Sequence, residues 1–284
     1  MSTEDAGYRL DKGMPVFADI DKTLLKGDTG KEWLVQAGVV SPEEFPEFVQ
    51  EYRRDDLGHS NELVKYLSEQ DPETVENLEE HVEAVRLPER AGLGEVLSHR
   101  HDEDVPTIGA SAGYRPVIQS ATNGNLHDII AGDLDENYNP VFNGQNEKRE
   151  NVEQYLERLV EETKWWAETD LPYTAIGDSN GDIEKLRGAS ESGGYAIAIG
   201  SSIEEARERV DEATFYVGDE EDHYLTAALL NDLTLNEEYQ MSSEELLEKS
   251  STKMDETMGI EPGELADKQD RRELNEFMRQ LNYD

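Results

Sequence analysis

The segment Val16-Phe17-Ala18-Asp19-Ile20-Asp21-Lys22-Thr23 decides the fold of this 284-residue chain. Its first three residues continue an apolar run that begins at Met14, and two carboxylates follow that run at once. A short, continuous apolar run is typical of a strand that is buried on both faces of a parallel sheet. Polar side chains at the carboxyl end of such a strand lie where open α/β sheets bind their ligands. The segment therefore predicts an α/β fold with a binding site directly after the first strand.

Further apolar runs predict the other strands of the sheet, and helical patterns lie between them. These runs cover residues 105–110, 127–131, 173–177, 195–199 and 214–217. Strands that alternate with helices indicate a parallel, doubly wound (Rossmann-like) sheet. The turn-rich stretch from Asn137 to Gly144 predicts a hairpin.

The first interval between strands is too long for a simple crossover. About eighty residues separate Thr23 from Val105, whereas a crossover needs roughly a dozen. Pro42 and Pro72 each follow a helix-capping residue and precede acidic residues, which predicts helix starts. We therefore expect a small helical cap, residues 28–99, inserted into an α/β core of residues 1–27 and 100–235. The pattern of residues 236–284 predicts an acidic helical extension. This extension could be a helix docked on the core, and the alternatives are a dimerisation arm or a mobile tail.

Several polar residues follow the predicted strands and would meet in one crevice. Those expected there are Asp19, Asp21, Ser111, Lys148, Asp178 and Asp182. Four carboxylates in one crevice repel one another unless a cation is present. Carboxylate oxygens favour Mg²⁺, which often shares its site with a phosphate group. The sequence therefore predicts a magnesium site that also handles phosphate.

Two of these motifs resemble those of the haloacid dehalogenase-like (HAD) hydrolase superfamily. The segment Asp19-Ile20-Asp21-Lys22-Thr23 matches its first motif, D-x-D-x-T, and Gly177-Asp178-Ser179-Asn180-Gly181-Asp182 resembles its fourth. Ser111 and Lys148 would be the second and third motifs, so that the resemblance covers roughly residues 14 to 232. The helical insertion is similar to the cap of phosphoserine phosphatases within that superfamily.

The resemblance implies a role for each matched residue. Asp19 would attack phosphate and form an aspartyl-phosphate. Asp21 would protonate the leaving oxygen and then activate water, and its backbone carbonyl would help to hold the metal. Lys148 would pair with Asp19 and the phosphoryl group.

The resemblance also implies a phosphate-binding group and a metal-binding group. Ser111 and the amide of Ala112 would bind the phosphoryl oxygens, and Thr23 would orient Asp21 beside them. The metal ligands implied are Asp19, Asp21, Asp178 and Asp182, the last acting through water or through Lys148.

Four assignments leave an alternative open. Ser120 also follows an apolar pair and competes with Ser111, although Ser111 leaves room for a helix before the next strand. Arg149 competes with Lys148. The carboxylates of Asp178 and Asp182 could cap the following helix instead of supporting the metal.

The expected activity is hydrolysis of a small phosphorylated metabolite. Phosphoryl transfer through the same intermediate and a non-catalytic binding role are the alternatives. The resemblance places Asp28 where phosphoserine phosphatases carry an acid for the substrate's amine. Their cap arginine, which holds the substrate's carboxylate, has no counterpart near Val64 and Lys65.

The charge of the chain is strongly negative, with 66 acidic and 26 basic residues and a net charge of −40. Because acidic residues interleave with apolar periodicity, we expect a folded surface adapted to molar salt and a halophilic source. The same charge disfavours a nucleic-acid partner. No apolar run reaches membrane-spanning length, no secretory signal is evident and cysteine is absent, so we expect a cytoplasmic protein. The oligomeric state is not predicted.

Overall fold

A computed structural model describes residues 14–52, 62–90, 93–141, 148–163, 171–210, 213 and 215–218. Its strands are β1 (Val16–Ala18), β2 (Thr107–Tyr114), β3 (Asp128–Leu134), β4 (Pro140–Val141), β5 (Thr174–Gly177), β6 (Tyr195–Ile199) and β7 (Phe215–Val217). Its α-helices are α1 (Thr29–Gln36), α2 (Phe45–Tyr52), α3 (Glu62–Ser68), α4 (Pro72–Glu79), α5 (Leu93–Asp102), α6 (Arg115–Ala121), α7 (Lys148–Thr163), α8 (Ile183–Glu191) and α9 (Ile203–Arg209).

The strands form one sheet in the order β4-β3-β2-β1-β5-β6-β7. All neighbouring pairs are parallel except β3 and β4, which form the antiparallel hairpin at one edge. β1 lies between β2 and β5, so that Ala18 pairs with Gly109 on one side and with Ile176 on the other. The chain winds outward from β1 in both directions, which confirms the predicted doubly wound α/β fold.

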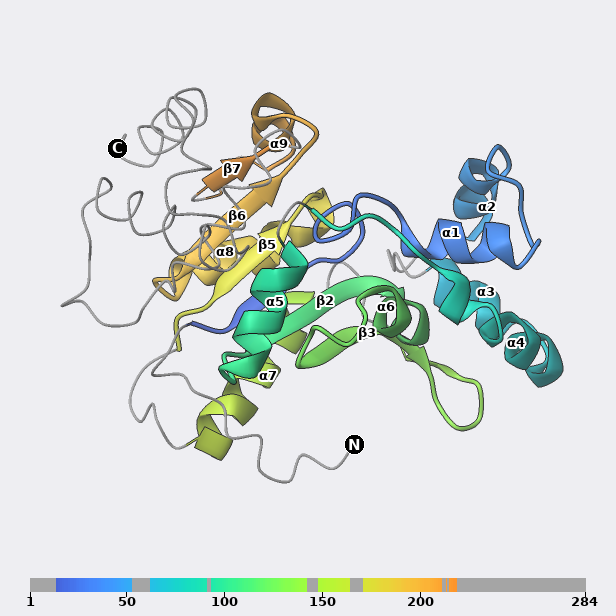
Figure 1. Cartoon of the computed structure of the whole chain (residues 1–284), viewed down its shortest axis with the longest axis horizontal. Coiled ribbons are helices and arrows are strands. Elements are labelled where there is room, and N and C mark those ends of the chain that lie inside the picture. The colour runs from blue at the N-terminus through green and yellow to red at the C-terminus, as the bar shows by residue number, and fades with distance from the viewer. Residues whose placement is uncertain are drawn as a thin grey trace.

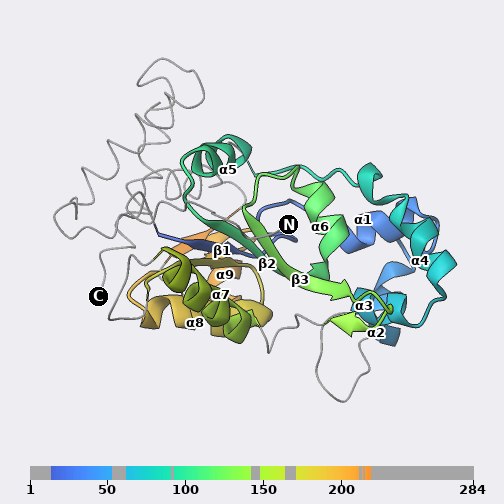
Figure 2. The ribbon, with the colours of Figure 1, turned by 90° about the horizontal axis from the view of Figure 1, so that it is seen from below.

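Helices cover both faces of the sheet (Figures 1 and 2). Successive strand residues point to opposite faces, so that Ala18 packs with α5 and α6 while Phe17 packs with α7 and α8. β6 follows the same alternation, with Ile197 and Ile199 on the first face and small alanines on the second. Burial on both faces explains why these strands are almost continuously apolar in sequence.

Helices α1 to α4 lie together beside the sheet, beyond the carboxyl end of β1 (Figure 1). Asp28 caps α1 by accepting from the Lys31 backbone N–H, and Asp71 caps α4 by accepting from that of Thr74. The ring of Trp33 stacks on Tyr114 of β2, with centroids 5.6 Å apart. This contact joins the helical insertion to the sheet through buried aromatic surface.

The two ends of the insertion lie side by side. The Lys26 N–H donates to the Pro88 carbonyl at 2.7 Å, and Leu25 and Glu89 form an antiparallel bridge. Arg90 then donates from its backbone to the Leu24 carbonyl. The predicted boundary at residues 99/100 falls inside α5, which packs on β2.

Parts of the predicted organisation lie outside the described residues. They include the extension 236–284 and the end of the predicted hairpin, residues 142–144. Within the described part of the chain, no helix combines the length and apolarity required to cross a membrane.

Candidate active site

The carboxyl end of β1 is the point where the sheet changes winding direction, and Asp19 is its first residue. The Asp19 backbone N–H donates to the Ile176 carbonyl of β5 at 2.9 Å, which fixes the chain between the two neighbouring strands. The loop then turns sharply, with Lys22 in a left-handed conformation at φ 60°. Backbone geometry therefore holds Asp19 and Asp21 in place at the sheet's switch point.

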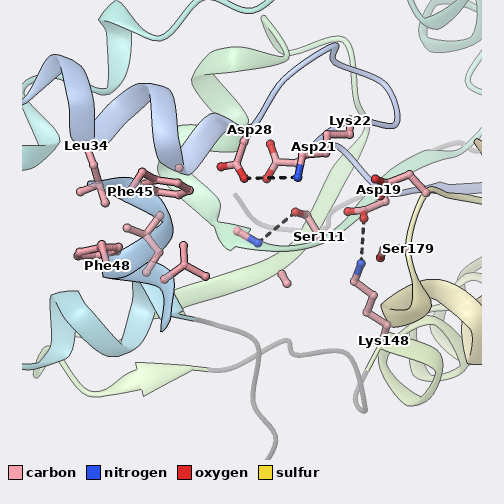
Figure 3. Close-up of a pocket in the computed structure, with 16 residues that line it drawn as sticks. Asp19, Asp21, Lys22, Asp28, Leu34, Phe45, Phe48, Ser111, Lys148 and Ser179 are labelled. Carbon is pink, nitrogen blue, oxygen red and sulfur yellow. Dashed lines mark hydrogen bonds and ion pairs between the residues drawn. The ribbon is translucent and has the colours of Figure 1, made fainter. Parts of the chain in front are cut away.

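A cavity of about 240 Å³ opens at this point. Its core side is lined by Asp19, Asp21, Ser111, Lys148 and Asp178 (Figure 3). With Ala112, which also lines the cavity, the structure brings together six of the predicted site residues.

Asp19 and Lys148 form a buried ion pair. The Lys148 Nζ lies 3.1 Å from Asp19 Oδ2 and 2.8 Å from Asp182 Oδ1. Burial alone would lower the pKa of Lys148, but Asp182 and Asp19 together raise it above its ordinary value. Lys148 is therefore a permanent cation beside the Asp19 carboxylate.

A second buried lysine, Lys185 of α8, shares Asp182 with Lys148. Its Nζ lies 3.0 Å from Asp182 Oδ1 and donates to the Ile176 carbonyl at 2.7 Å. Burial lowers the pKa of Lys185, and its side chain is fully buried. The sequence reasoning did not identify Lys185, because a lysine in a charged helix is typical of a solvated face.

Asp182 is completely enclosed by donors. Ser179 donates to its Oδ2 from both hydroxyl and backbone, while the two lysines contact Oδ1. Burial opposes a charge here, but Lys148 and Lys185 hold the pKa of Asp182 below its ordinary value. Asp182 also takes part in the capping box with Ser179. The contacts with Lys148 agree with a role through that lysine, and the Asp182 side chain makes no capping hydrogen bond to the following helix, α8.

Asp21 lies on the side of the cavity nearest the helical insertion. Its Oδ1 accepts from the Thr29 N–H at 2.7 Å. Burial and the neighbouring Asp28 raise the pKa of Asp21 to about 8. The carboxyl group of Asp21 therefore takes up a proton far more readily than an ordinary aspartic acid in this environment.

Asp19, Asp178 and Asp182 offer carboxylate oxygens that all lie within 4.8 Å of one another. Burial and Asp19 raise the pKa of Asp178 to about 7, and burial and Asp182 raise that of Asp19. These acids repel one another at close range, and a bound cation would remove the repulsion. Hard oxygen donors in this arrangement fit Mg²⁺.

Thr23 takes a position behind this cluster. It is fully buried, and its hydroxyl donates to Asp178 Oδ1 at 3.5 Å. It is not among the described residues that line the cavity. The observed contact supports Asp178, whereas the sequence prediction assigned Thr23 to orienting Asp21 beside the phosphate.

Ser111 and Ala112 also line the cavity, and Ser111 lies on the side of Asp19 and Asp21 (Figure 3). The Ser111 Oγ accepts from the Gly113 N–H at 3.1 Å, at an irregular point of β2. Its rival Ser120 lies in helix α6 and is not among the described lining residues. The structure thus distinguishes the two serines by position.

Arg149, the rival of Lys148, points away from the cavity. It pairs with Glu153 and Glu191, each at 2.7 Å, and its side chain is 30% exposed. Lys148 is the basic residue that faces Asp19.

Arg90 is a second residue that sequence reasoning missed. Its side chain is buried and donates to the carbonyls of Thr23 at 2.5 Å and Lys22 at 2.8 Å. Arg90 therefore ties the end of the insertion to the loop that carries Asp19 and Asp21. No local pattern marks this arginine, because its acceptors are backbone groups 67 and 68 residues away.

Comparisons with known proteins agree with this architecture. The family model described as haloacid dehalogenase-like hydrolase matches residues 16–187. The solved structure of a phospho-aspartyl intermediate analogue of phosphoserine phosphatase is 20% identical, covers 75% of this chain and 97% of its own, and has a TM-score of 0.50. A substrate-bound phosphoserine phosphatase complex is 19% identical, with coverages of 75% and 96% and a TM-score of 0.51. No match was found among curated protein sequences.

Proposed function

Because the chain belongs to the haloacid dehalogenase-like hydrolase family, we propose that it is a magnesium-dependent phosphatase acting on a small phosphorylated metabolite. The observation that carries the proposal is the Asp19–Lys148 ion pair, 3.1 Å long, at the end of β1 in a cavity shared with Ser111 and Asp178. A buried carboxylate beside a cation, facing an open cavity, suits a nucleophile that attacks an anionic substrate.

In the first step Asp19 attacks the phosphorus atom. A bond forms from its carboxylate oxygen to phosphorus, the bond from phosphorus to the ester oxygen breaks, and an aspartyl-phosphate results. Lys148 stabilises the charge that spreads over the phosphoryl oxygens. Ser111 and the amide of Ala112 take the opposite side of the phosphoryl group.

Asp21 supplies and recovers the proton. Its raised pKa, about 8, supports a protonated acid that gives its proton to the leaving oxygen. In the second step Asp21 takes a proton from water as that water attacks the aspartyl-phosphate. Phosphate leaves and Asp19 is regenerated.

Asp19, the backbone carbonyl of Asp21 and Asp178 would hold Mg²⁺. When bound, the ion neutralises charge on the phosphoryl oxygens. Thr23 supports Asp178, and Asp182 acts by holding Lys148. We assign residues 28–90 to a helical cap that selects the substrate and place α5 with the core domain, because α5 packs on β2.

The decisive experiment is phosphate release from an aryl phosphate in molar salt with Mg²⁺. Wild-type protein is expected to hydrolyse the ester, and chelation of the metal should stop the reaction. Asp19→Asn should lower kcat by at least about a thousandfold, because it removes the nucleophile. Arg149→Lys, at the neighbouring surface position of Lys148, should leave kcat within about twofold.

Activity that survives Asp19→Asn would exclude the aspartyl-phosphate route. Phosphorylated product formed in the presence of an added alcohol would instead favour phosphoryl transfer. Metal binding without turnover of any ester would favour a non-catalytic role.

A further inference from the structure

The half of the cavity that faces the insertion is apolar. Leu34 of α1, Phe45, Phe48 and Val49 of α2, and Leu63 of α3 line it. Figure 3 shows the two phenylalanines and Leu34 gathered at the end of the cavity opposite Asp19 and Lys148. The phosphate end and the apolar end thus lie at opposite sides of one space.

The apolar wall is partly accessible and internally ordered. Phe45, Phe48 and Val49 are half-buried, and the rings of Phe45 and Phe48 stack with centroids 6.1 Å apart. Phe48 also meets Tyr66 edge-on at 5.2 Å. A ligand that covered this wall would bury apolar surface, and it would lie beside Lys31, whose Nζ is 5.9 Å from the centroid of the Phe45 ring.

The charges of the cavity oppose a second anionic group. Among the described lining residues, the acids on the side of the insertion are Asp21 and Asp28, and the lysines of the cavity are Lys22 and Lys148. Lys148 is held by Asp19 and Asp182, and Lys22 lies 4.0 Å from Asp28. A substrate carboxylate near the insertion would therefore meet acids and apolar side chains.

The size of the cavity limits the ligand further. Its volume of about 240 Å³ lies below the roughly 300–1,000 Å³ of pockets for drug-sized ligands. Such a space suits a phosphate group with one short chain or a single ring.

We propose, building on the phosphatase function above, that the substrate is a small phosphomonoester whose leaving alcohol is apolar and carries no carboxylate. The wall formed by Phe45, Phe48 and Val49 recognises that alcohol. Phosphoserine, whose alcohol is a charged amino acid, is a poor substrate.

The test compares the hydrolysis of benzyl phosphate, ethyl phosphate and O-phosphoserine in molar salt with Mg²⁺. All three are phosphate esters of alkyl alcohols, so that they differ mainly in the group that would meet the wall. For wild-type protein kcat/KM for benzyl phosphate should exceed that for phosphoserine about tenfold or more. Val49→Ala should lower the value for benzyl phosphate about tenfold and that for ethyl phosphate, whose shorter chain covers less of the wall, by a smaller factor. The matched control is Val40→Ala, since Val40 is a half-buried valine of the insertion outside the described lining.

Val49→Lys adds a cation to the wall and should reverse the preference toward phosphoserine. A wild-type preference for phosphoserine would overturn this inference and leave the phosphatase proposal standing. The inference would also be overturned if Val49→Ala lowered kcat/KM equally for all three esters while Val40→Ala lowered it for none.

If no ester is hydrolysed, the phosphatase proposal fails, and binding decides the substrate class. Calorimetry on Asp19→Asn should then show tighter binding of benzyl phosphate than of phosphoserine. Equal or weaker binding of benzyl phosphate would overturn the inference.

Discussion

Asp182 carries the negative charge that allows two lysines to lie buried beside each other. Lys148 and Lys185 approach the same Oδ1 atom, at 2.8 and 3.0 Å. Removing one partner of a buried charge network leaves an uncompensated charge in a low-dielectric interior, which is costly. Asp182 is therefore a structural requirement as well as a support for Lys148.

Asp182→Asn is expected to lower the free energy of unfolding by about 3–5 kcal/mol. Denaturation in urea at fixed salt measures the loss. Adding Lys185→Met should recover part of the lost free energy of unfolding. In Asp182→Asn both buried lysines lack their anionic partner, and Lys185→Met removes one of these uncompensated positive charges. The control is Glu153→Gln, which breaks the exposed pair with Arg149 and should cost no more than about 1 kcal/mol. Equal losses for Asp182→Asn and Glu153→Gln would contradict the buried network.

His127 couples stability to pH at the start of β3. Its Nδ1 accepts from the Thr107 N–H at 3.1 Å, and its ring stacks on His101. Burial, His101 and Arg100 lower its pKa from the ordinary 6.5 to about 4. The unfolded chain therefore binds this proton more tightly than the folded chain does.

The stability gained from neutral His127 is complete above pH 6.5 and is lost as the pH falls toward 4. His127→Gln keeps an acceptor for Thr107 but cannot titrate. The unfolding free energy of this variant should fall less between pH 7 and 4 than that of the wild type. Chemical denaturation at several pH values provides the comparison, and parallel curves would exclude the effect.

At the scale of elements, the loop after β1 depends on a residue from the far end of the insertion. Arg90 bridges the carbonyls of Lys22 and Thr23, and Lys22 holds a left-handed conformation directly after Asp21. A planar guanidinium can bond both carbonyls at once, whereas an ammonium group lacks that fork. Arg90 is thus a positioning residue for the loop.

Arg90→Lys is expected to lower kcat about tenfold to a hundredfold with a smaller change in KM, because misplaced acids act mainly on the reaction step. Steady-state kinetics with one ester gives both constants. Arg86→Lys is the matched control, since Arg86 donates only to its neighbour's carbonyl among the contacts described. A rise in KM at constant kcat would indicate a substrate-binding role instead.

Local sequence was sufficient for most of the sheet. β5 and β6 match their predicted runs within one residue, because strands buried on both faces are continuously apolar. β2 runs four residues beyond the predicted Ala110, since small residues continue the strand toward Tyr114. β3 likewise extends to Leu134, where it pairs with β4.

The site was predictable to the extent that its residues follow strands. Asp19 and Asp178 could be placed in this way, because parallel strands end at one edge. Ser111 was expected after a strand but lies within β2, where the pairing with β3 becomes irregular. Arg90 could not be placed, since its acceptors are 67 and 68 residues away in sequence. Lys185 could not, because its i,i+3 spacing from Asp182 is equally typical of an exposed helical pair. The apolar wall of the cavity could not be predicted from the sequence either, because leucine and phenylalanine side chains in a helix usually belong to the hydrophobic core.

At the scale of the whole molecule, the dominant property is a net charge of −40. Exposed acids run along helices, as Glu150, Glu153 and Glu157 do on α7. Only one of these three, Glu153, pairs with a base among the described contacts. Like charges at such spacing destabilise the folded state until salt screens them.

The free energy of unfolding should rise as KCl increases from about 0.1 M to about 1 M, because the Debye length falls from about 10 Å to about 3 Å. Thermal or urea unfolding across this range measures the change. Replacing Glu47 and Glu157, both exposed, with glutamine should stabilise the protein more at low salt than at high salt. A stability independent of salt would argue against adaptation to a saline environment.

The bridge between Leu25 and Glu89 also bears on how such a protein can diversify. The insertion leaves and rejoins the sheet at neighbouring points, with the Lys26 N–H bonded to the Pro88 carbonyl. The segment between these points is closed at its base, although Trp33 also packs on Tyr114 of β2. Its solvent-facing residues are therefore the ones that can change without altering the strand register. Changes in α1, α2 and α3 that reach the cavity wall would alter the space beside Asp19 while the loop that carries Asp19 and Asp21 keeps its place.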